Sequence, residues 1–388
     1  MRILYLHRTQ AKGVEGVHIG EVIKAMRAEG HDVHIVSPVG GQIGAVSDEK
    51  ARAGLKARLF AAITRRMPEL GFELLELAYN LQAIRQIRGA CRRDSVDAIF
   101  ERYSIFGLAG VFMAGRWRTR FYLEINYTSC SPLVRRRSAL LRPLARWVDR
   151  RLFQSAAALF PVSTVLKEQL IRDYGVAPDR IHVLPNAADP AVFDPARIAP
   201  HTAAVSGRLI GFVGGFYPWH GLPLLLDAFI RIAPQVPDAR LLLIGDGPMR
   251  GEIERRIKAH GLEGRVVLAG SIAHAALPPY IASFHIGVMP DSNDYGSPMK
   301  IFEYMAMGKP VVVPDYGPLR DAVTDGEEGL IFAPGNAADL ARCLMALFGD
   351  PELHRKMSAR ARDRILTRHN WRENTRTILK VMQTGVQS

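Results

Sequence analysis

The sequence has few cysteines and no long apolar run. Its three cysteines, Cys91, Cys130 and Cys343, stand far apart and are odd in number, so we expect reduced thiols and neither a disulfide framework nor a metal site. No segment is apolar enough to span a bilayer, and the first residues form too short an apolar run for a signal peptide. We therefore expect a cytoplasmic protein.

The usual fingerprints of nucleotide binding are missing as well. The glycine-containing turns fit neither a G-x-G-x-x-G motif nor a Walker loop. Hydrophobic residues make up 48% of the chain, with 34 glycines and 24 prolines, which is typical of a globular protein with many turns. A length of 388 residues favours two domains over one.

Positive charge is in excess, with 51 basic against 38 acidic residues and a net charge of +13. Seven arginines fall within residues 135–151, beside an apolar stripe of Leu140, Leu141, Leu144, Trp147 and Val148. The segment is either a helix that rests on an anionic membrane surface or a core-packing helix with a solvated face. Nucleic-acid binding is not favoured, because stacking aromatics should then interleave with the arginines and Trp147 stands alone.

Short apolar runs alternate with helical patterns through both halves of the chain, which predicts two parallel α/β sheets. The predicted strands are 3–6, 33–36, 98–101, 121–124 and 158–162, then 209–213, 241–244, 266–268, 286–289 and 311–313. Predicted helices include 19–29, 79–93 and 371–382. Residues 186–207 are interpreted as a linker. Two such domains should face a shared cleft, because open parallel sheets bind ligands at the carboxyl ends of their strands.

Three glycine-containing turns follow predicted strands and could hold a phosphate, since glycine lets the backbone approach closely and a following helix offers free N–H groups. Each could equally be an ordinary turn. The residues concerned are Gly13, Gly16 and His18 in the first half, Gly214, Gly215 and His220 after 209–213, and Gly245 and Asp246 after 241–244.

The most informative segment is 295–310. Ser297 is a good N-cap and Pro298 a good first helical residue, so the amides of Met299 and Lys300 should point out of a helix start. A diphosphate there would gain N–H donors, the helix dipole and the Lys300 ammonium without a metal ion. Glu303 lies one turn further on, where it could accept hydrogen bonds from a ribose or simply form a surface ion pair with Lys300.

Glu124 ends a predicted strand of the first half. It could orient an acceptor or act as a base, or it could cap a nearby helix or pair with Arg102. His18 and the neighbouring pair Glu101 and Arg102 are weaker candidates for contact with the cleft.

The segment 295–310, together with 161–164, 183–189, 210–215 and 226–229, resembles the family-4 retaining glycosyltransferases. The resemblance implies the GT-B fold, with an acceptor domain over 1–200, a donor domain over 205–367 and a C-terminal helix over 368–388 that crosses back. It also implies transfer from a nucleoside-diphosphate sugar, with retention and without an essential metal or other cofactor.

By that resemblance Glu303 holds the ribose. The family's first glutamate is Tyr295 here, and its phosphate-binding arginine and lysine are Gly215 and His220, so Lys300 should carry more of the phosphate charge. The expected acceptor is a polysaccharide or lipid-linked intermediate of a bacterial cell surface. A GT-B nucleotide-sugar 2-epimerase or a phosphorylase is the alternative, and a nucleic-acid-binding protein a remote one.

Overall fold

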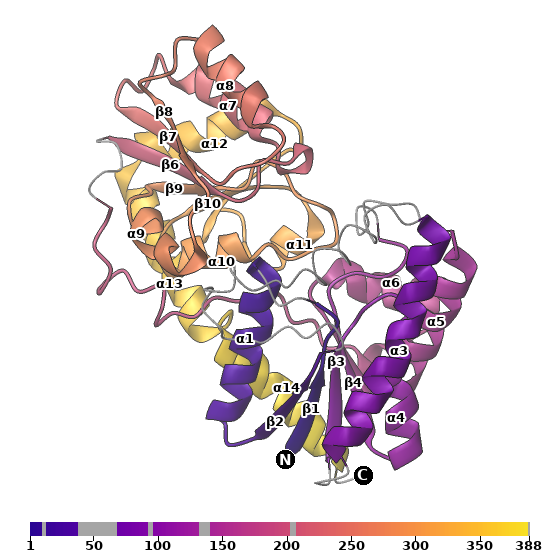
Figure 1. Cartoon of the computed structure of the whole chain (residues 1–388). Helices are drawn as coiled ribbons and strands as arrows, with labels where there is room; N and C mark the ends of the chain where they lie inside the picture. Colours follow the sequence, from indigo (N-terminus) through magenta and orange to yellow (C-terminus); the bar gives the residue numbers. More distant parts are fainter. Residues whose placement is uncertain (10–12, 38–67, 92–95, 132–139, 202–206, 387–388) are drawn as a thin grey trace, which may run out of the picture. The chain divides into compact units, whose positions relative to one another are not determined.

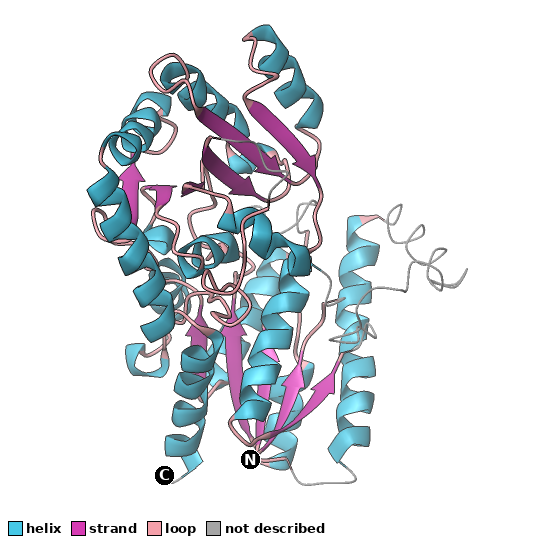
Figure 2. Ribbon diagram, turned by 90° about the vertical axis from the view of Figure 1, so that its left-hand side faces the viewer, coloured by secondary structure: helices cyan, strands magenta, loops and turns pink. Residues whose placement is uncertain are grey.

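The computed structural model describes residues 1–9, 13–37, 68–91, 96–131, 140–201 and 207–386. The chain forms two compact units (Figure 1). The first comprises Met1–Leu184 with Thr375–Ser388, and the second comprises Pro185–Asn374. Each unit has a parallel sheet with helices packed on it (Figure 2), and each is described separately.

The first unit has a five-stranded sheet in the order β2-β1-β3-β4-β5. Its strands are β1 Arg2–Leu6, β2 Asp32–Val36, β3 Ala98–Arg102, β4 Arg120–Ile125 and β5 Ala158–Pro161. Its helices are α1 Gly13–Ala28, α3 Glu69–Cys91, α4 Ala109–Trp117, α5 Arg142–Ser155, α6 Thr164–Tyr174 and the short η2 Pro178–Arg180, with most of α14, Trp371–Val386. The Tyr122 hydroxyl donates to the Met382 carbonyl at 3.3 Å, which fixes α14 to β4.

The second unit has a six-stranded sheet in the order β11-β10-β9-β6-β7-β8. Its strands are β6 Arg208–Val213, β7 Ala239–Ile244, β8 Val266–Gly270, β9 Ile286–Val288, β10 Val311–Pro314 and β11 Gly329–Phe332. Its helices are η3 Pro218–His220, α7 Leu222–Ile232, α8 Arg250–Ala259, η4 His274–Ala276, α9 Leu277–Ala282, α10 Met299–Ala306, α11 Gly317–Arg320, α12 Ala337–Gly349 and α13 Pro351–Thr367.

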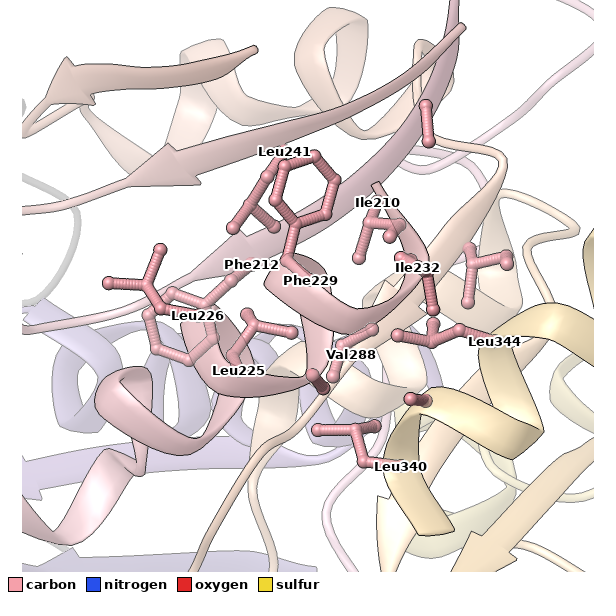
Figure 3. Close-up of a cluster of buried hydrophobic side chains, with 14 of the residues drawn as sticks. Ile210, Phe212, Leu225, Leu226, Phe229, Ile232, Leu241, Val288, Leu340 and Leu344 are labelled. Atoms are coloured by element: carbon pink, nitrogen blue, oxygen red, sulfur yellow. The ribbon is translucent and has the colours of Figure 1, made fainter. Parts of the chain in front are cut away.

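The core of the second unit lies between its sheet and the helices α7 and α12. Figure 3 shows Leu225 and Phe229 of α7 beside Ile210 of β6 and Leu344 of α12. These four side chains are fully buried. Burying side chains of this size contributes about 1.5–3 kcal/mol each, so the core holds the strand ends, where the candidate site lies, in fixed positions.

The structure corrects several predicted boundaries. β11 was missed, and α1 and α3 begin at Gly13 and Glu69, earlier than expected. Residues 185–200, expected in the first domain, belong to the second unit; Phe193 is buried there, and the Ala188 N–H donates to the His369 carbonyl at 3.2 Å. Tertiary packing thus orders part of the predicted linker.

Among the described residues, no helix has both the length and the apolarity needed to cross a bilayer.

Candidate functional site

Two of the predicted glycine turns meet at the carboxyl ends of β6 and β7. The Gly214 N–H donates to the Ile244 carbonyl at 2.9 Å, and the Phe216 N–H donates to the Asp246 carbonyl at 2.9 Å. Gly245 has φ +138°, and a Cβ there would overlap the Gly214 carbonyl oxygen. Only glycine allows the two loops to approach this closely.

Lys300, in the first turn of α10, extends toward these loops. Its Nζ lies 4.4 Å from the centre of the Phe212 ring, and a Cβ added to Gly214 would lie 2.6 Å from it. The nitrogen is buried and has no hydrogen-bond partner within the described residues. Burial lowers the pKa of Lys300 to about 7, although Glu303 opposes the shift. A buried ammonium without a partner is costly, so this position favours an anionic ligand.

His220 lies beside Lys300. Its Nδ1 contacts the Gly215 carbonyl oxygen, which can only accept, so Nδ1 carries the proton and Nε2 has the lone pair. Burial, and then the Lys300 charge, lower the pKa of His220 to about 4. The imidazole is therefore neutral in the ligand-free protein and must gain a proton on Nε2 before it can donate to a phosphate oxygen.

Glu303 is buried, with 3% of its surface exposed. Its Oε1 lies 2.7 Å from the Nε2 of His274 in η4, and no Lys300–Glu303 ion pair occurs among the described residues. The surface ion pair considered as an alternative is therefore not formed. Sequence reasoning missed His274, because it is 29 residues away in the chain and has no motif around it.

The sequence predicted Ser297 as the N-cap of α10, and this prediction is wrong. The N-cap is Pro298, and it makes no side-chain capping bond. The Ser297 Oγ instead accepts the Asn186 N–H at 3.0 Å, and the Asn186 side chain donates to the Ser297 carbonyl. The first N–H groups of a helix have no partner within it, and among the described residues the Met299 and Lys300 N–H groups donate to no other group.

Tyr295 lies in the turn before α10. Its N–H donates to the Asn293 side chain at 3.3 Å. Asp291, at the start of the same loop, accepts the Tyr316 hydroxyl at 2.9 Å. Gly221 lies close by, where an added Cβ would come within 2.6 Å of the Asp291 Cβ. Hydrogen bonds to Asn293 and from Tyr316 thus hold the loop in place.

In the first unit, Glu124 is surrounded by donors. It accepts from Arg102, from the Asn126 amide at 2.6 Å and from the Tyr5 hydroxyl at 3.2 Å, and its Oε1 lies 2.9 Å from the Nε2 of His18. Burial alone would raise its pKa, but His18 and Arg102 outweigh burial and hold the pKa of Glu124 well below its usual range. The expected pairing with Arg102 is observed, and a carboxylate this stable is a poor base; a role in orienting the acceptor stays a prediction.

Residues 13–18 of the expected phosphate turn form the start of α1 and not a loop. α1 begins at Gly13, which has φ +62°, and Gly16 lies inside the helix. His18 is buried, with its imidazole on Glu124. Lys12 lies outside the described residues.

Two family models match the chain. One, described as "Glycosyl transferases group 1", matches residues 207–350, and the other, "Glycosyl transferase 4-like domain", matches residues 15–187. The chain belongs to the group 1 glycosyltransferases. It is an enzyme of the transferase class with the GT-B fold.

Relatives and solved structures agree with this assignment. This glycosyltransferase is 26% identical to the α-D-kanosaminyltransferase of Streptomyces kanamyceticus over 299 residues, which is 74% of this chain and 75% of the relative. The crystal structure of a glycosyltransferase from Rickettsia africae is similar in fold, with a TM-score of 0.78 at 16% identity over 100% of this chain and 99% of that one. The Anabaena protein HepE, crystallised with UDP-glucose, has a TM-score of 0.71 at 17% identity over 99% and 100% of the two chains.

The glycosyltransferase exposes an apolar and basic surface along α5 and just before its first residue. Leu140, Leu144 and Trp147 are 59%, 36% and 51% exposed, and the arginines of α5 are exposed with them: Arg142, Arg146, Arg150 and Arg151. Val148 of the predicted stripe instead packs into the core. The core-packing interpretation is therefore confirmed for Val148, and contact of the exposed side chains with a membrane stays a prediction. Residues 135–139 lie outside the described part of the chain.

The start of α5 is fastened to α3. The buried Glu73 carboxylate accepts the N–H groups of Leu140 and Leu141 at 3.1 and 3.0 Å. α3 also exposes Leu70 and Leu74, which are 46% and 54% accessible. Exposed leucines thus occur on both helices near this junction.

Among the described residues, no group of three or more His, Cys, Asp or Glu side chains could hold a metal ion.

Proposed function

We propose that the enzyme transfers a sugar from a nucleoside-diphosphate sugar to a hydroxyl acceptor, with retention of configuration. The observation that carries the proposal is the buried Lys300 ammonium, which has no partner among the described residues and lies between Gly214 and the start of α10. A diphosphate bound there would receive the ammonium and the first helical N–H groups together. The second unit is thus the donor-binding unit.

The same groups assist the reaction. When the bond between sugar and phosphate breaks, negative charge grows on the departing phosphate and positive charge on the sugar ring. Donors fixed around the phosphate stabilise that state more than the ground state. His220 contributes once it is protonated, since only the imidazolium can donate from Nε2 while Nδ1 remains on Gly215. No metal is needed in this scheme, and turnover should persist in excess EDTA.

Glu303 holds the ribose of the donor. Its carboxylate lies one turn, roughly 5 Å, further along α10 than Lys300, and it is buried next to His274. Two ribose hydroxyls can donate to one carboxylate. Glu124, by contrast, orients Arg102 and His18 in the first unit. The leaving phosphate itself assists the attack by helping to deprotonate the acceptor hydroxyl.

The acceptor is a polysaccharide or lipid-linked intermediate of a bacterial cell surface, presented at an anionic membrane. The α5 surface supports this view, because arginines beside exposed Leu144 and Trp147 are the side chains that bind an anionic headgroup layer. The protein should sediment with vesicles that contain phosphatidylglycerol and not with purely zwitterionic ones. Binding to neither would refute the membrane contact and leave the donor site unaffected.

The decisive experiment tests the donor. UDP- and GDP-sugars should be screened for their effect on the thermal unfolding of the purified enzyme, because a tight ligand raises apparent stability by about 2.7 kcal/mol at one hundred times its Kd. A stabilising donor is then followed with Lys300→Ala. Near-normal turnover of that variant at saturating donor would sink the assignment of Lys300 to the leaving group. Release of free nucleoside diphosphate at full rate without an acceptor would instead indicate the 2-epimerase.

A further inference from the structure

A small pocket lies at the carboxyl ends of β1 and β3 in the first unit. From β1 the sheet extends to β2 on one side and to β3 on the other (Figure 1), so this is the switch point where open parallel sheets bind ligands. Its volume is about 20 Å³, which is room for little more than one water-sized group. The side chains that line it include His7, Arg8, Tyr79, Glu101 and Ser104.

Glu101 is the acid of this pocket. It is 3% exposed, and its Oε2 makes no hydrogen bond of normal geometry within the described residues. Glycines pack against both oxygens: a Cβ at Gly107 would lie 2.9 Å from Oε1, and one at Gly110 would overlap Oε2. Burial raises the pKa of Glu101 to about 8, and the Arg8 charge and the Gly110 amide offset only part of this. The carboxyl group is therefore protonated at neutral pH.

His7 supplies a second polar atom without a partner. It is 1% exposed, and its Nδ1 accepts the Thr9 N–H at 3.4 Å. That bond favours the tautomer with the proton on Nε2, and Nε2 has no acceptor within the described residues. Burial, and then Arg102, lower the pKa of His7 to about 4, so the ring is uncharged.

The charges around the pocket are already balanced. Arg8 forms an ion pair with Glu76 of α3 at 2.8 Å. α3 also presents Tyr79, and α4 presents Ala109. Among the lining residues that the structure describes, none offers an uncompensated positive charge to a phosphate.

The wall of the pocket is fixed before any ligand arrives. Asn80 of α3 accepts the N–H groups of Leu108 and Ala109 at 2.7 and 3.1 Å and donates to the Phe106 carbonyl at 2.8 Å. These bonds hold the loop before α4 in place. Glu101 and His7 both line this rigid cavity, and each has a buried polar atom without a hydrogen bond of normal geometry among the described residues. Because buried polar atoms are rarely left in this state, the two side chains point to a ligand.

We infer that the pocket binds one uncharged hydroxyl or hydroxymethyl group of the sugar acceptor, held by Glu101 and His7. The acid donates its O–H and accepts with its carbonyl oxygen, and the imidazole donates from Nε2, so a hydroxyl can satisfy all of these groups. This inference rests on the proposed transferase function and adds to it the chemistry of the acceptor subsite. The group bound is neutral, and the site is too small for a whole sugar ring.

Binding of neutral probes to the full-length protein tests the inference. The probes are methyl α-D-glucopyranoside, methyl α-D-mannopyranoside and myo-inositol, measured by ligand-observed NMR with UDP present, and glucose 6-phosphate serves as the charged comparison. At least one neutral probe should bind more tightly than glucose 6-phosphate. Glu101→Leu should weaken that probe about tenfold, the effect of losing a buried hydrogen bond.

A change of pH provides the second readout. Raising the pH from about 7 to about 9.5 ionises Glu101 and should weaken the probe about tenfold for the wild type but not for Glu101→Gln, whose amide stays neutral. Glu168→Gln, an exposed carboxylate of α6 in the same unit, should follow the wild type. This comparison tests whether Glu101 holds the probe even if Glu101→Leu fails to fold.

The inference is overturned if no neutral probe binds the wild type, if the phosphorylated probe is preferred, or if the wild type and Glu101→Gln respond alike to pH. Thermal stabilisation by UDP, measured on the same samples, separates this failure from failure of the proposed function. UDP binding without probe binding would overturn only the acceptor pocket. Loss of UDP binding by the wild type would instead count against the donor site.

Discussion

Replacing Lys300 with methionine should stabilise the ligand-free protein and abolish its response to UDP. The Lys300 pKa falls from 10.5 to about 7 on burial. At about 1.4 kcal/mol per unit, keeping this ammonium charged in the folded protein costs roughly 5 kcal/mol. Methionine has a similar length and no charge, so Lys300→Met removes that cost while it retains the contact with Phe212.

The free energy of unfolding should depend on pH, and the direction of this dependence follows from the lowered pKa of Lys300. Between pH 7 and 10.5 the unfolded chain binds a proton that the folded chain does not, so the stability of the wild type should rise with pH in this window, by up to about 1.4 kcal/mol per unit. Below pH 7 both states carry the proton and the full cost remains. The difference between wild type and Lys300→Met should therefore be largest near pH 6 and shrink as the pH rises toward 10.

Urea unfolding at several pH values measures this difference, with and without UDP. Lys309→Met is the matched control, because Lys309 is also buried, with its pKa lowered to about 8, but its Nζ donates to the Ala282 carbonyl at 2.7 Å. Lys309→Met should respond to UDP like the wild type. Parallel pH profiles for wild type and Lys300→Met, or equal stabilisation of both by UDP, would refute the reasoning.

Further predictions concern the neighbouring groups. His220→Lys should tighten UDP binding, by about fivefold at neutral pH, and lower the stability of the free protein, because it adds a second ammonium beside Lys300; calorimetry and thermal unfolding measure the two effects. Glu303→Gln should reduce the preference for UDP over 2′-deoxy-UDP, which is expected to be about tenfold in the wild type, and an unchanged ratio would exclude the ribose contact. Trp147→Ser should weaken sedimentation with anionic vesicles while leaving UDP binding as it was. Glu124→Gln should cost about 3–5 kcal/mol of stability, as expected when a buried ion pair loses one partner, and urea unfolding checks this.

The ten predicted strands could be found from sequence because parallel strands are buried on both faces and read as continuous apolar runs. β6 and β10 are of this kind, with buried residues along nearly their whole length. β11 was missed because Gly329–Phe332 is a four-residue edge strand with two half-buried positions. A run that short is not distinguishable from a loop by periodicity.

Segment 295–310 shows which contacts cannot be predicted from the sequence pattern of one segment alone. Lys300 and Glu303 follow from the spacing along α10, but Ser297 was assigned a capping role that its hydroxyl does not perform. Serine favours N-caps because its oxygen can accept a nearby N–H, and here the N–H comes from Asn186, 111 positions away. The His274 contact to Glu303 is equally non-local. The hydrogen-bond partners of Ser297 and Glu303 come from distant segments, and no pattern within one segment reveals them.

Glu101 and Glu124 illustrate the same limit for charge. Both are buried glutamates that stand one residue before the end of neighbouring strands, and periodicity alone does not distinguish their surroundings. Alternation along β3 places Glu101 and Arg102 on opposite faces of the sheet, and the register that sets Arg102 opposite Glu124 gives the arginine to Glu124 alone. Glu101 is left facing Gly110 of α4. One carboxylate is therefore held ionised and the other protonated, so the sheet, and not the residue type, determines which of them can donate a hydrogen bond to a sugar.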